Sequence, residues 1–353
     1  MKILITGVAG FVGSRLAEEI SAAMESASLV GIDNLSRRGS ETNLALLKKL
    51  GCQFIHGDIR NADDVAELPK VDWIVDCAAN PSVLAGVTGG SAQLVGHNLI
   101  GTLNLLEKCR RDRCGFLMLS SSRVYSIEAL CGISFKEDND RFIPHPSKPL
   151  PTGFSWEGVS ENFPTSSPIS LYGATKLASE VMALEYASAF EFPLWIDRCG
   201  VIAGAGQFGK IDQGIFSFWI YHWMLGKPLS YIGFGGKGKQ VRDLLCPQDL
   251  ARLVCLQLAN PDKEAPKIVN VGGGLESSMS LKELSQYCAD KFGVSRKIKS
   301  VPETRTFDIP YYVTDNTLVQ ETWHWKPEVK ITDTLNAVAE WAKANQSIIA
   351  AGF

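Results

Sequence analysis

The stretch KILITGVAGFVGSRLAEEI, residues 2–20, decides the fold because it joins a strand to a helix through a glycine-rich turn. KILIT is a short run rich in β-branched residues, and the residues after Gly13 carry apolar side chains at helical spacing. Gly7, Gly10 and Gly13 stand between the two elements. Glycines in such a turn let the backbone approach a pyrophosphate, whose charge is met by amides at the helix start. The stretch therefore predicts a dinucleotide-binding unit.

Further strands follow along the chain, with helical patterns between several of them. They are predicted over 28–33, 52–58, 71–79, 114–122 and 192–200. Such alternation is typical of a parallel sheet with helices on both faces. We expect an α/β protein with a Rossmann-type, doubly wound parallel sheet over 1–200. The pattern loosens beyond this point, which predicts a smaller, discontinuous α/β substrate-binding domain over 201–353, with segments near 239–258 and 308–330 returning to the first domain.

The composition excludes several classes of protein. The chain has 353 residues, of which 45% are hydrophobic, so it can bury a large core. A net charge of −3 with scattered Lys and Arg gives no attraction for nucleic acid or anionic membranes, and we expect neither as a partner. Nine cysteines without a CxxC pair predict reduced thiols in the cytoplasm and no metal site.

Two further segments bear on location and access. The chain enters a strand at once, which leaves no room for a signal sequence. The apolar window 214–225 is too short to span a membrane and predicts a buried or interface helix. The segment 126–167 is rich in Pro, Ser and Gly, and long connections of this kind are commonly lids or binding loops.

Asp33 ends the second predicted strand about twenty residues after the glycine turn, where a carboxylate accepts hydrogen bonds from an adenosine ribose. It would repel a 2′-phosphate and so favours NAD over NADP, although Arg37 and Arg38 could offset that repulsion. Asp58 ends the third strand and suits either the adenine edge or a strand-end cap, and both interpretations stay open. The predicted cofactor contacts are Gly7, Gly10, Phe11, Val12, Gly13, Asp33, Asn34, Arg37, Asp58, Ile59, Ala78, Ala79 and Cys199.

The stretch SLYGATK, residues 170–176, opens a predicted helix and holds Tyr172 and Lys176 four residues apart. This spacing puts both side chains on one helix face. An ammonium beside a phenol stabilises the phenolate, which would make Tyr172 a proton acceptor near neutral pH. The motif is weak alone but strong after a dinucleotide-binding turn, and together they predict redox chemistry at a hydroxyl group.

The chain resembles the extended short-chain dehydrogenase/reductases, the family of nucleotide-sugar epimerases and dehydratases. The resemblance covers nearly the whole length, through TGVAGFVG, NLIGTLNLLE, SSSRVY, YGATK and KQVRDLLCPQDLA. Within the family it is most similar to the CDP-paratose (CDP-tyvelose) 2-epimerase group, through DNLSRRGSETNL, CAANPSVLAGV, RCGVIAGAGQFGKIDQG and PLSYIGFGGKGKQVRDLL. The resemblance implies NAD-dependent epimerisation of a nucleotide sugar, at carbon 2 of a CDP-sugar, with tightly retained NAD.

The same resemblance implies roles for the catalytic residues. Tyr172 would be the base, Lys176 its partner and a ligand of the nicotinamide ribose, and Ser121 the hydroxyl that binds the reacting sugar oxygen. In related 4,6-dehydratases an Asp and a Glu follow that hydroxyl, whereas Ser122 and Arg123 stand here. The chain therefore resembles an epimerase more than a dehydratase.

The resemblance also implies substrate contacts. Arg242 matches the arginine that meets the diphosphate, although it could instead pair with Asp243 or Asp249 inside the protein. Asn98 matches a cofactor-site residue that steadies the active-site backbone, with a buried, satisfied asparagine as the alternative. The implied substrate contacts are Pro81, Ser82, Ser121, Ser122, Arg123, Gly200, Lys210, Gln213, Arg242 and Arg305.

Several alternatives remain from sequence alone. The same residues suit a 4-epimerase, a GDP- or UDP-sugar, a net dehydrogenase with exchangeable cofactor, or an NAD-binding regulator without activity. His97, His145 and His222 show no triad or metal spacing, and we expect them to be structural. Family members pair through two helices each, which implies a homodimer or homotetramer through the helices of NLIGTLNLLEKC and ATKLASEVMALEY.

Overall fold

A seven-stranded sheet forms the larger part of the computed structural model, which describes residues 1–87, 89–210 and 213–352. Its strand order is β12-β8-β5-β4-β1-β2-β3, and every neighbouring pair is parallel. The strands are β1 (Lys2–Thr6), β2 (Ser28–Asp33), β3 (Gln53–His56), β4 (Trp73–Asp76), β5 (Gly115–Ser121), β8 (Leu194–Cys199) and β12 (Ile268–Val271). The order reverses between β1 and β4, which confirms the predicted doubly wound Rossmann-type sheet.

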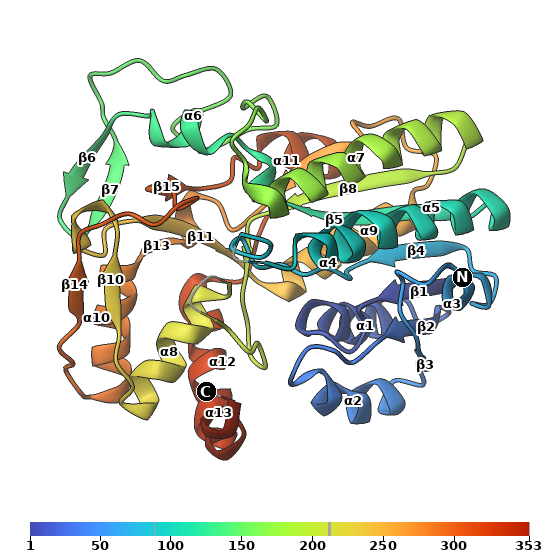
Figure 1. Ribbon diagram of the computed structural model, residues 1–353, viewed down its shortest axis with the longest axis horizontal. Coiled ribbons are helices and arrows are strands. Elements are labelled where there is room, and N and C mark those ends of the chain that lie inside the picture. The colour runs from blue at the N-terminus through green and yellow to red at the C-terminus, as the bar shows by residue number, and fades with distance from the viewer. Residues whose placement is uncertain (88, 211–212, 353) are drawn as a thin grey trace.

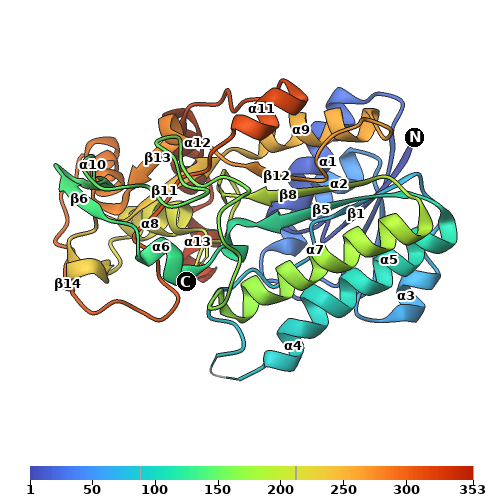
Figure 2. The same cartoon turned by 90° about the horizontal axis from the view of Figure 1, so that it is seen from above.

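Helices cover both faces of this sheet (Figures 1 and 2). One face packs against α1 (Phe11–Ala23), α2 (Leu44–Lys49), α9 (Pro247–Ala259) and α11 (Thr317–Trp323). The other packs against α3 (Ala62–Ala66), α5 (Gly101–Asp112) and α7 (Ser170–Phe190). Strands buried on both faces carry mostly apolar side chains, as in the buried β4. Its last residue, Asp76, is the polar exception and accepts from the Thr6 hydroxyl at 2.7 Å.

The smaller part lies at the carboxyl ends of the large sheet's strands and contains short strands with helices (Figure 1). Its strands are β9 (Val201–Ile202), β10 (Ser230–Ile232), β11 (Val241–Leu245), β13 (Ser278–Ser280), β14 (Lys299–Val301) and β15 (Tyr311–Tyr312). Its helices are α8 (Ile215–Leu225), α10 (Leu281–Phe292), α12 (Ile331–Ala344) and α13 (Gln346–Gly352), with 3-10 turns η4 (Phe234–Gly236) and η5 (Leu275–Ser277). The apolar window 214–225 thus forms α8, whose Phe216, Trp219 and Trp223 are buried in this part's core.

The chain crosses between the two parts more than once. Residues 268–271 return to the large sheet as β12, and α9 packs against α1. The strand β11, by contrast, pairs with β9, β13 and β15. The discontinuity expected from the loosened pattern is therefore present, and the domain limits drawn from the sequence stay a prediction.

The segment 126–167 contains a hairpin of β6 (Phe135–Asp138) and β7 (Arg141–Pro144), preceded by α6 (Ile127–Cys131). Arg141 donates from Nε and Nη2 to the two carboxylate oxygens of Glu283 at the start of α10, both at 2.8 Å. Lys237 and Lys239 pair with Glu137 at 2.8 and 2.9 Å. These ion pairs attach the hairpin to the smaller part.

Candidate active site

A cavity of about 410 Å³ opens between the large sheet and the smaller part. Its walls include residues just after β1, β2, β4, β5 and β8, together with residues from β11, β13 and the loops of the smaller part. The carboxyl ends of parallel strands at a switch in strand order are where ligands bind in such sheets. The cavity is therefore the candidate site, and the predicted residues can be located against it.

The glycine turn after β1 forms the floor of one end. Gly7 has a φ of +59°, and a Cβ at Gly13 would lie 2.3 Å from the Gly7 carbonyl oxygen. These two glycines are needed for the tight turn. Gly10 has only the Gly7 oxygen near its Cβ position, at 3.1 Å, and its surface faces the cavity. Helix α1 has no side-chain cap and no acidic residue in its first turn, so its first amides suit an anion.

Asp33 is held at the end of β2 by backbone amides. Its Oδ1 accepts from the Leu35 amide at 2.8 Å, and its Oδ2 accepts from the Ala9 amide at 3.0 Å. Burial raises the pKa of the Asp33 carboxyl, while these hydrogen bonds oppose the rise. The carboxylate is thus fixed between the glycine turn and the cavity, in position to accept from a ribose hydroxyl.

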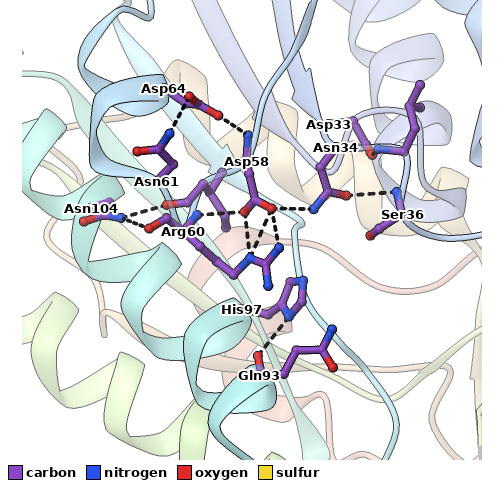
Figure 3. Close-up of polar contacts among 12 residues, drawn as sticks. Asp33, Asn34, Ser36, Asp58, Arg60, Asn61, Asp64, Gln93, His97 and Asn104 are labelled. Carbon is purple, nitrogen blue, oxygen red and sulfur yellow. Dashed lines mark hydrogen bonds and ion pairs between the residues drawn. The ribbon is translucent and has the colours of Figure 1, made fainter. Parts of the chain in front are cut away.

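Asp58 lies next to Asn34 and Arg60 at the neighbouring strand end (Figure 3). Its Oδ2 accepts from Asn34 Nδ2 at 2.9 Å and from Arg60 Nη2 at 2.6 Å. The hydrogen bond from Arg60 holds the pKa of Asp58 well below its usual range. Asp58 also lines the cavity, so it is both a strand-end anchor and available to a base edge. His97 lines the same end, although we expected it to be structural, and its Nδ1 lies 2.9 Å from the Gln93 carbonyl oxygen.

Ser121 and Tyr172 meet on the opposite wall. Ser121 ends β5, and Tyr172 lies in the first turn of α7, as the sequence predicts. The Ser121 Oγ accepts from the Arg123 amide at 3.1 Å, and both Ser121 and Tyr172 line the cavity. Burial raises the pKa of Tyr172, and the contacts with Ser121 and the charge of Arg123 lower it. That the phenol and the hydroxyl share one substrate oxygen stays a prediction.

Lys176 follows one turn later on α7 and is buried. Burial lowers the pKa of Lys176, and the carboxylates of Asp76 and Glu180 raise it. Glu180 is fixed in turn by the hydroxyl of Ser120 and by Arg198, whose Nη2 lies 2.7 Å from Glu180 Oε2. Ser120 therefore acts as a strand-end hydroxyl in a buried network. That Lys176 stabilises the phenolate stays a prediction.

Asn98 lies behind the cavity wall, in a π-helical turn, η2 (Gly96–Ile100), between α4 (Ser91–Val95) and α5. Its Oδ1 accepts from the Asn80 amide at 2.8 Å, and its Nδ2 donates to Thr175 Oγ1 at 3.1 Å. Asn98 thus joins the strand-end loop to α7. Asn98 is therefore buried and satisfied, and its role as a cofactor-site residue stays a prediction.

Two arginines pair with one carboxylate at another part of the cavity wall. Arg242 Nη2 lies 3.3 Å from Asp308 Oδ1, and Arg305 Nη2 lies 3.5 Å from Asp308 Oδ2. Asp249 instead pairs with Arg252, so the internal pairing that the sequence left open for Arg242 is with Asp308. Burial, and secondly the charge of Arg123, lower the pKa of Arg242 to about 10, at which it remains charged in neutral solution.

Most predicted residues line the cavity. They are Gly7, Gly10, Phe11, Val12, Gly13, Asp33, Asn34, Arg37, Asp58, Ile59, Ala78, Ala79, Pro81, Ser121, Ser122, Arg123, Tyr172, Lys176, Cys199, Gly200, Gln213, Arg242 and Arg305. Ser82, Asn98 and Lys210 lie outside the lining. The exposed Lys210 donates from its backbone amide to the Gln213 carbonyl oxygen at 2.6 Å, while Gln213 accepts from Arg37 across the cavity.

Sequence reasoning missed several lining residues. They are His97, Gln207, Phe208, Gln240, Met279, Ser280 and Asp308, among others. Two of them lie close in sequence to predicted site residues and could have been considered. His97 directly precedes Asn98, and Asp308 lies three positions after Arg305. The others belong to short elements of the smaller part, where no periodic pattern marks a cavity wall.

Comparisons with known proteins agree with this geometry. The sequence profile of the NAD dependent epimerase/dehydratase family matches residues 3–272. The chain belongs to this family. CDP-paratose 2-epimerase of Salmonella typhi is 31% identical over 98% of this chain and 100% of that protein. UDP-glucuronate 4-epimerase of Thermodesulfobacterium geofontis is 27% identical over 98% of this chain and 97% of that protein.

Solved structures of family members share the fold. UDP-glucuronic acid 4-epimerase from Bacillus cereus, in complex with UDP-glucuronic acid and NAD, superposes with a TM-score of 0.79 at 26% identity, covering 98% of this chain and 99% of that one. A dTDP-glucose 4,6-dehydratase from Bacillus anthracis in complex with NAD gives a TM-score of 0.76 at 21% identity, covering 100% of both chains.

NAD is the cofactor of this family, and the residues present fit it. The open surface of Gly10, the uncapped start of α1 and the fixed Asp33 carboxylate suit a pyrophosphate and a ribose.

Within the described ranges, the structure contains no group of three or more His, Cys, Asp and Glu side chains that could hold a metal ion. Across the same residues, none of the helices combines the length and apolar character required to cross a bilayer.

Proposed function

We propose that the protein epimerises a nucleotide sugar at carbon 2, with a CDP-sugar of the paratose or tyvelose type as substrate. The observation that carries this proposal is the meeting of Ser121 and Tyr172, with Lys176 one turn on, on one wall of a cavity whose other end holds the glycine turn and Asp33. A hydroxyl bound against Tyr172 would lie between a proton acceptor and the cofactor. This arrangement suits reversible oxidation of a secondary alcohol.

The chain's own residues supply the proton transfers. Tyr172 accepts the proton of the carbon 2 hydroxyl, and the Ser121 hydroxyl holds that oxygen in place. Bound NAD would supply the hydride acceptor and donor for the same carbon. Once the ketone has presented its other face, Tyr172 gives the proton back to the oxygen. The bonds broken are remade with inversion, so the reaction needs no outside oxidant.

The residues after Ser121 argue against elimination of water. Ser122 and Arg123 stand where related dehydratases carry an Asp and a Glu. A guanidinium does not exchange protons in the neutral range, so Arg123 is unsuited as a general acid.

The two arginines that pair with Asp308 suit a diphosphate, because guanidinium forks match phosphate oxygens. We infer that Arg242 and Arg305 bind the diphosphate.

The choice of carbon 2 and of a CDP-sugar is supported by the relative at 31% identity and by the resemblance of the loops. A second candidate, epimerisation at carbon 4, is favoured by the relative named as a UDP-glucuronate 4-epimerase, at 27% identity. The two differ in which hydroxyl of the sugar lies against Tyr172 and in which base the smaller part accepts.

A panel of nucleotide sugars tests this proposal. The purified protein is incubated with CDP-, GDP- and UDP-hexoses and with their deoxy derivatives, and the products are assigned by proton NMR. We expect inversion at carbon 2 of a CDP-sugar and no product with Tyr172→Phe. Inversion at carbon 4 would favour the second candidate. No inversion of any sugar by a protein that binds NAD would favour a non-catalytic regulator.

A further inference from the structure

Arg123 lies between Ser121 and the segment that carries Arg305 and Asp308. Its backbone amide donates to Ser121 Oγ at 3.1 Å, and its Nη1 donates to the Phe307 carbonyl oxygen at 3.2 Å. The side chain lines the cavity. Arg123 is therefore fixed at both ends, by the hydroxyl at the end of β5 and by a backbone carbonyl of the smaller part.

Phe307 connects Arg123 to Tyr172 from the other side. The Phe307 side chain packs against the apolar cluster of Val83, Leu94 and Tyr172, while its carbonyl holds Arg123. Phe307 has a φ of +66°, a left-handed conformation that is unusual for a bulky residue and is seen where the surrounding structure imposes it. Ser121 and Phe307 thus bracket the guanidinium and the phenol on two sides.

Different charged groups act on Tyr172 and on Lys176. Burial raises the pKa of Tyr172, the Ser121 hydroxyl lowers it, the Cys199 thiol raises it, and the positive charge of Arg123 lowers it. Burial raises the pKa of Cys199 well above its usual value, so this thiol stays neutral. Lys176 interacts with the carboxylates of Asp76 and Glu180, which offset its positive charge.

The charges around Arg123 leave it able to act on the phenol. Burial lowers the pKa of Arg123, the charge of Arg305 also lowers it, and the carboxylate of Asp308 and the phenols of Tyr172 and Tyr312 raise it. Asp308 is already shared with Arg242 and Arg305. One carboxylate among three guanidiniums leaves a net positive charge, which favours a negative charge on a neighbouring phenol.

We propose that Arg123 is a positioning residue for Tyr172, which holds the phenol beside Ser121 and stabilises its deprotonated form. The inference rests on the proposed function, in which Tyr172 is the proton acceptor. It also explains why an arginine and not an acidic residue stands at position 123, because a carboxylate there would disfavour the phenolate. Arg123 would then act alongside Lys176, whose own pKa is raised by the carboxylates of Asp76 and Glu180 against the lowering by burial.

The test is a titration of the phenol in the NAD-bound protein without sugar, followed as tyrosinate absorbance near 295 nm. The chain has eight tyrosines, so the signal of Tyr172 is obtained by subtracting the titration of Tyr172→Phe. We expect Arg123→Met to raise the pKa of Tyr172 by about one unit or more, as the loss of a close opposite charge does. Arg123→Lys should return the pKa most of the way to the wild-type value.

Arg305→Met is the matched control, because it removes the same charge from the same cavity at a residue that faces Asp308. It should shift the Tyr172 pKa by much less than Arg123→Met does, because Arg123 and not Arg305 is among the charges that act on the phenol. If Arg123→Met fails to fold, Arg123→Gln retains a donor for the Phe307 carbonyl and makes the same comparison. An unshifted Tyr172 pKa in a folded, NAD-bound Arg123 variant would overturn the inference, while turnover by that variant would leave the proposed function standing.

Discussion

Tyr172 is the residue on which the proposed chemistry most depends. Phenylalanine at this position keeps the ring that packs against Val83 and removes only the hydroxyl. We expect Tyr172→Phe to lower kcat at least about a hundredfold, the usual contribution of a positioned acid–base group. NAD content and thermal unfolding should stay near the wild-type values, and they are measured alongside turnover. Activity within a few fold of wild type would remove Tyr172 from the mechanism.

Asp197 makes a prediction about stability that does not depend on the reaction. It is buried in β8, its Oδ1 accepts from Gln257 Nε2 at 2.8 Å, and its Oδ2 has no partner among the residues that the structure describes. Burial raises the pKa of Asp197 to about 7. The folded state therefore binds this proton more tightly than the unfolded state. The free energy of unfolding falls as pH rises from the usual pKa of an aspartate, 3.8, to the folded value of about 7.

The variant Asp197→Asn removes this ionisation. We expect the stability of the variant relative to wild type to increase from pH 5 to pH 8, by about 1.4 kcal/mol per pH unit up to the folded pKa. Thermal unfolding at several pH values measures the difference, with Asp262→Asn at an exposed site as the control. A difference between Asp197→Asn and wild type that does not change with pH would contradict the assignment.

Residues were predictable where a motif fixed both their type and their place. Ser121, Tyr172 and Lys176 stand at fixed intervals in SSSRVY and YGATK, and the structure brings them to one wall. Asp308 was missed because its place depends on a long-range pairing with Arg242, which no local pattern records. His97 was missed because a histidine without triad or metal spacing gives no reason to expect it in a cavity.

At the level of elements, α5 and α7 lie side by side on one face of the molecule (Figure 2) and leave apolar side chains exposed. Ile100, just before α5, is 42% exposed, and Val181 and Phe190 on α7 are 51% and 46% exposed. Exposed apolar side chains on paired helices suit an interface between two copies of a chain. We propose that the protein forms a homodimer, or a dimer of dimers, through this face.

The variant Val181→Glu tests this interface. A charge at an exposed site costs a monomer little but is desolvated in a dimer. We expect wild type to sediment as a dimer or tetramer and Val181→Glu to dissociate at least tenfold more readily. Leu256→Glu, at a residue 40% exposed on α9 on the other face of the sheet, is the matched control and should behave as wild type. A monomeric wild type would contradict the proposal.

The strands of the large sheet were predictable because each is a short apolar run closed by a polar or small residue, and β1, β2, β4, β5 and β8 all appear. The helix α7 was predictable from its motif and its length. The strands β11, β13 and β15 were harder, since each is five residues or shorter and pairs with segments far away in sequence. Pairing of this kind is set by tertiary packing and not by local preference.

At the scale of the whole molecule, the cavity is closed by both parts of the chain. Arg37 on the cofactor side donates to the Phe208 carbonyl oxygen at 3.3 Å and to Gln213. A cofactor beneath these contacts would be slow to leave. We expect NAD to remain bound through purification, seen as a 260 nm absorbance that is released on denaturation. If the protein purified without NAD, needed added cofactor for turnover and converted that cofactor between its oxidised and reduced forms, the result would favour a net dehydrogenase.

In the proposed reaction, a sugar carbon is oxidised and reduced again within one closed site. The direct measurement is proton NMR of CDP-paratose or CDP-tyvelose incubated with the NAD-bound protein in deuterium oxide. Return of the original hydride predicts that the carbon 2 epimer forms with no deuterium at carbon 2. Deuterium at the inverted carbon would contradict the account, because it would show that the hydrogen had exchanged with solvent as a proton.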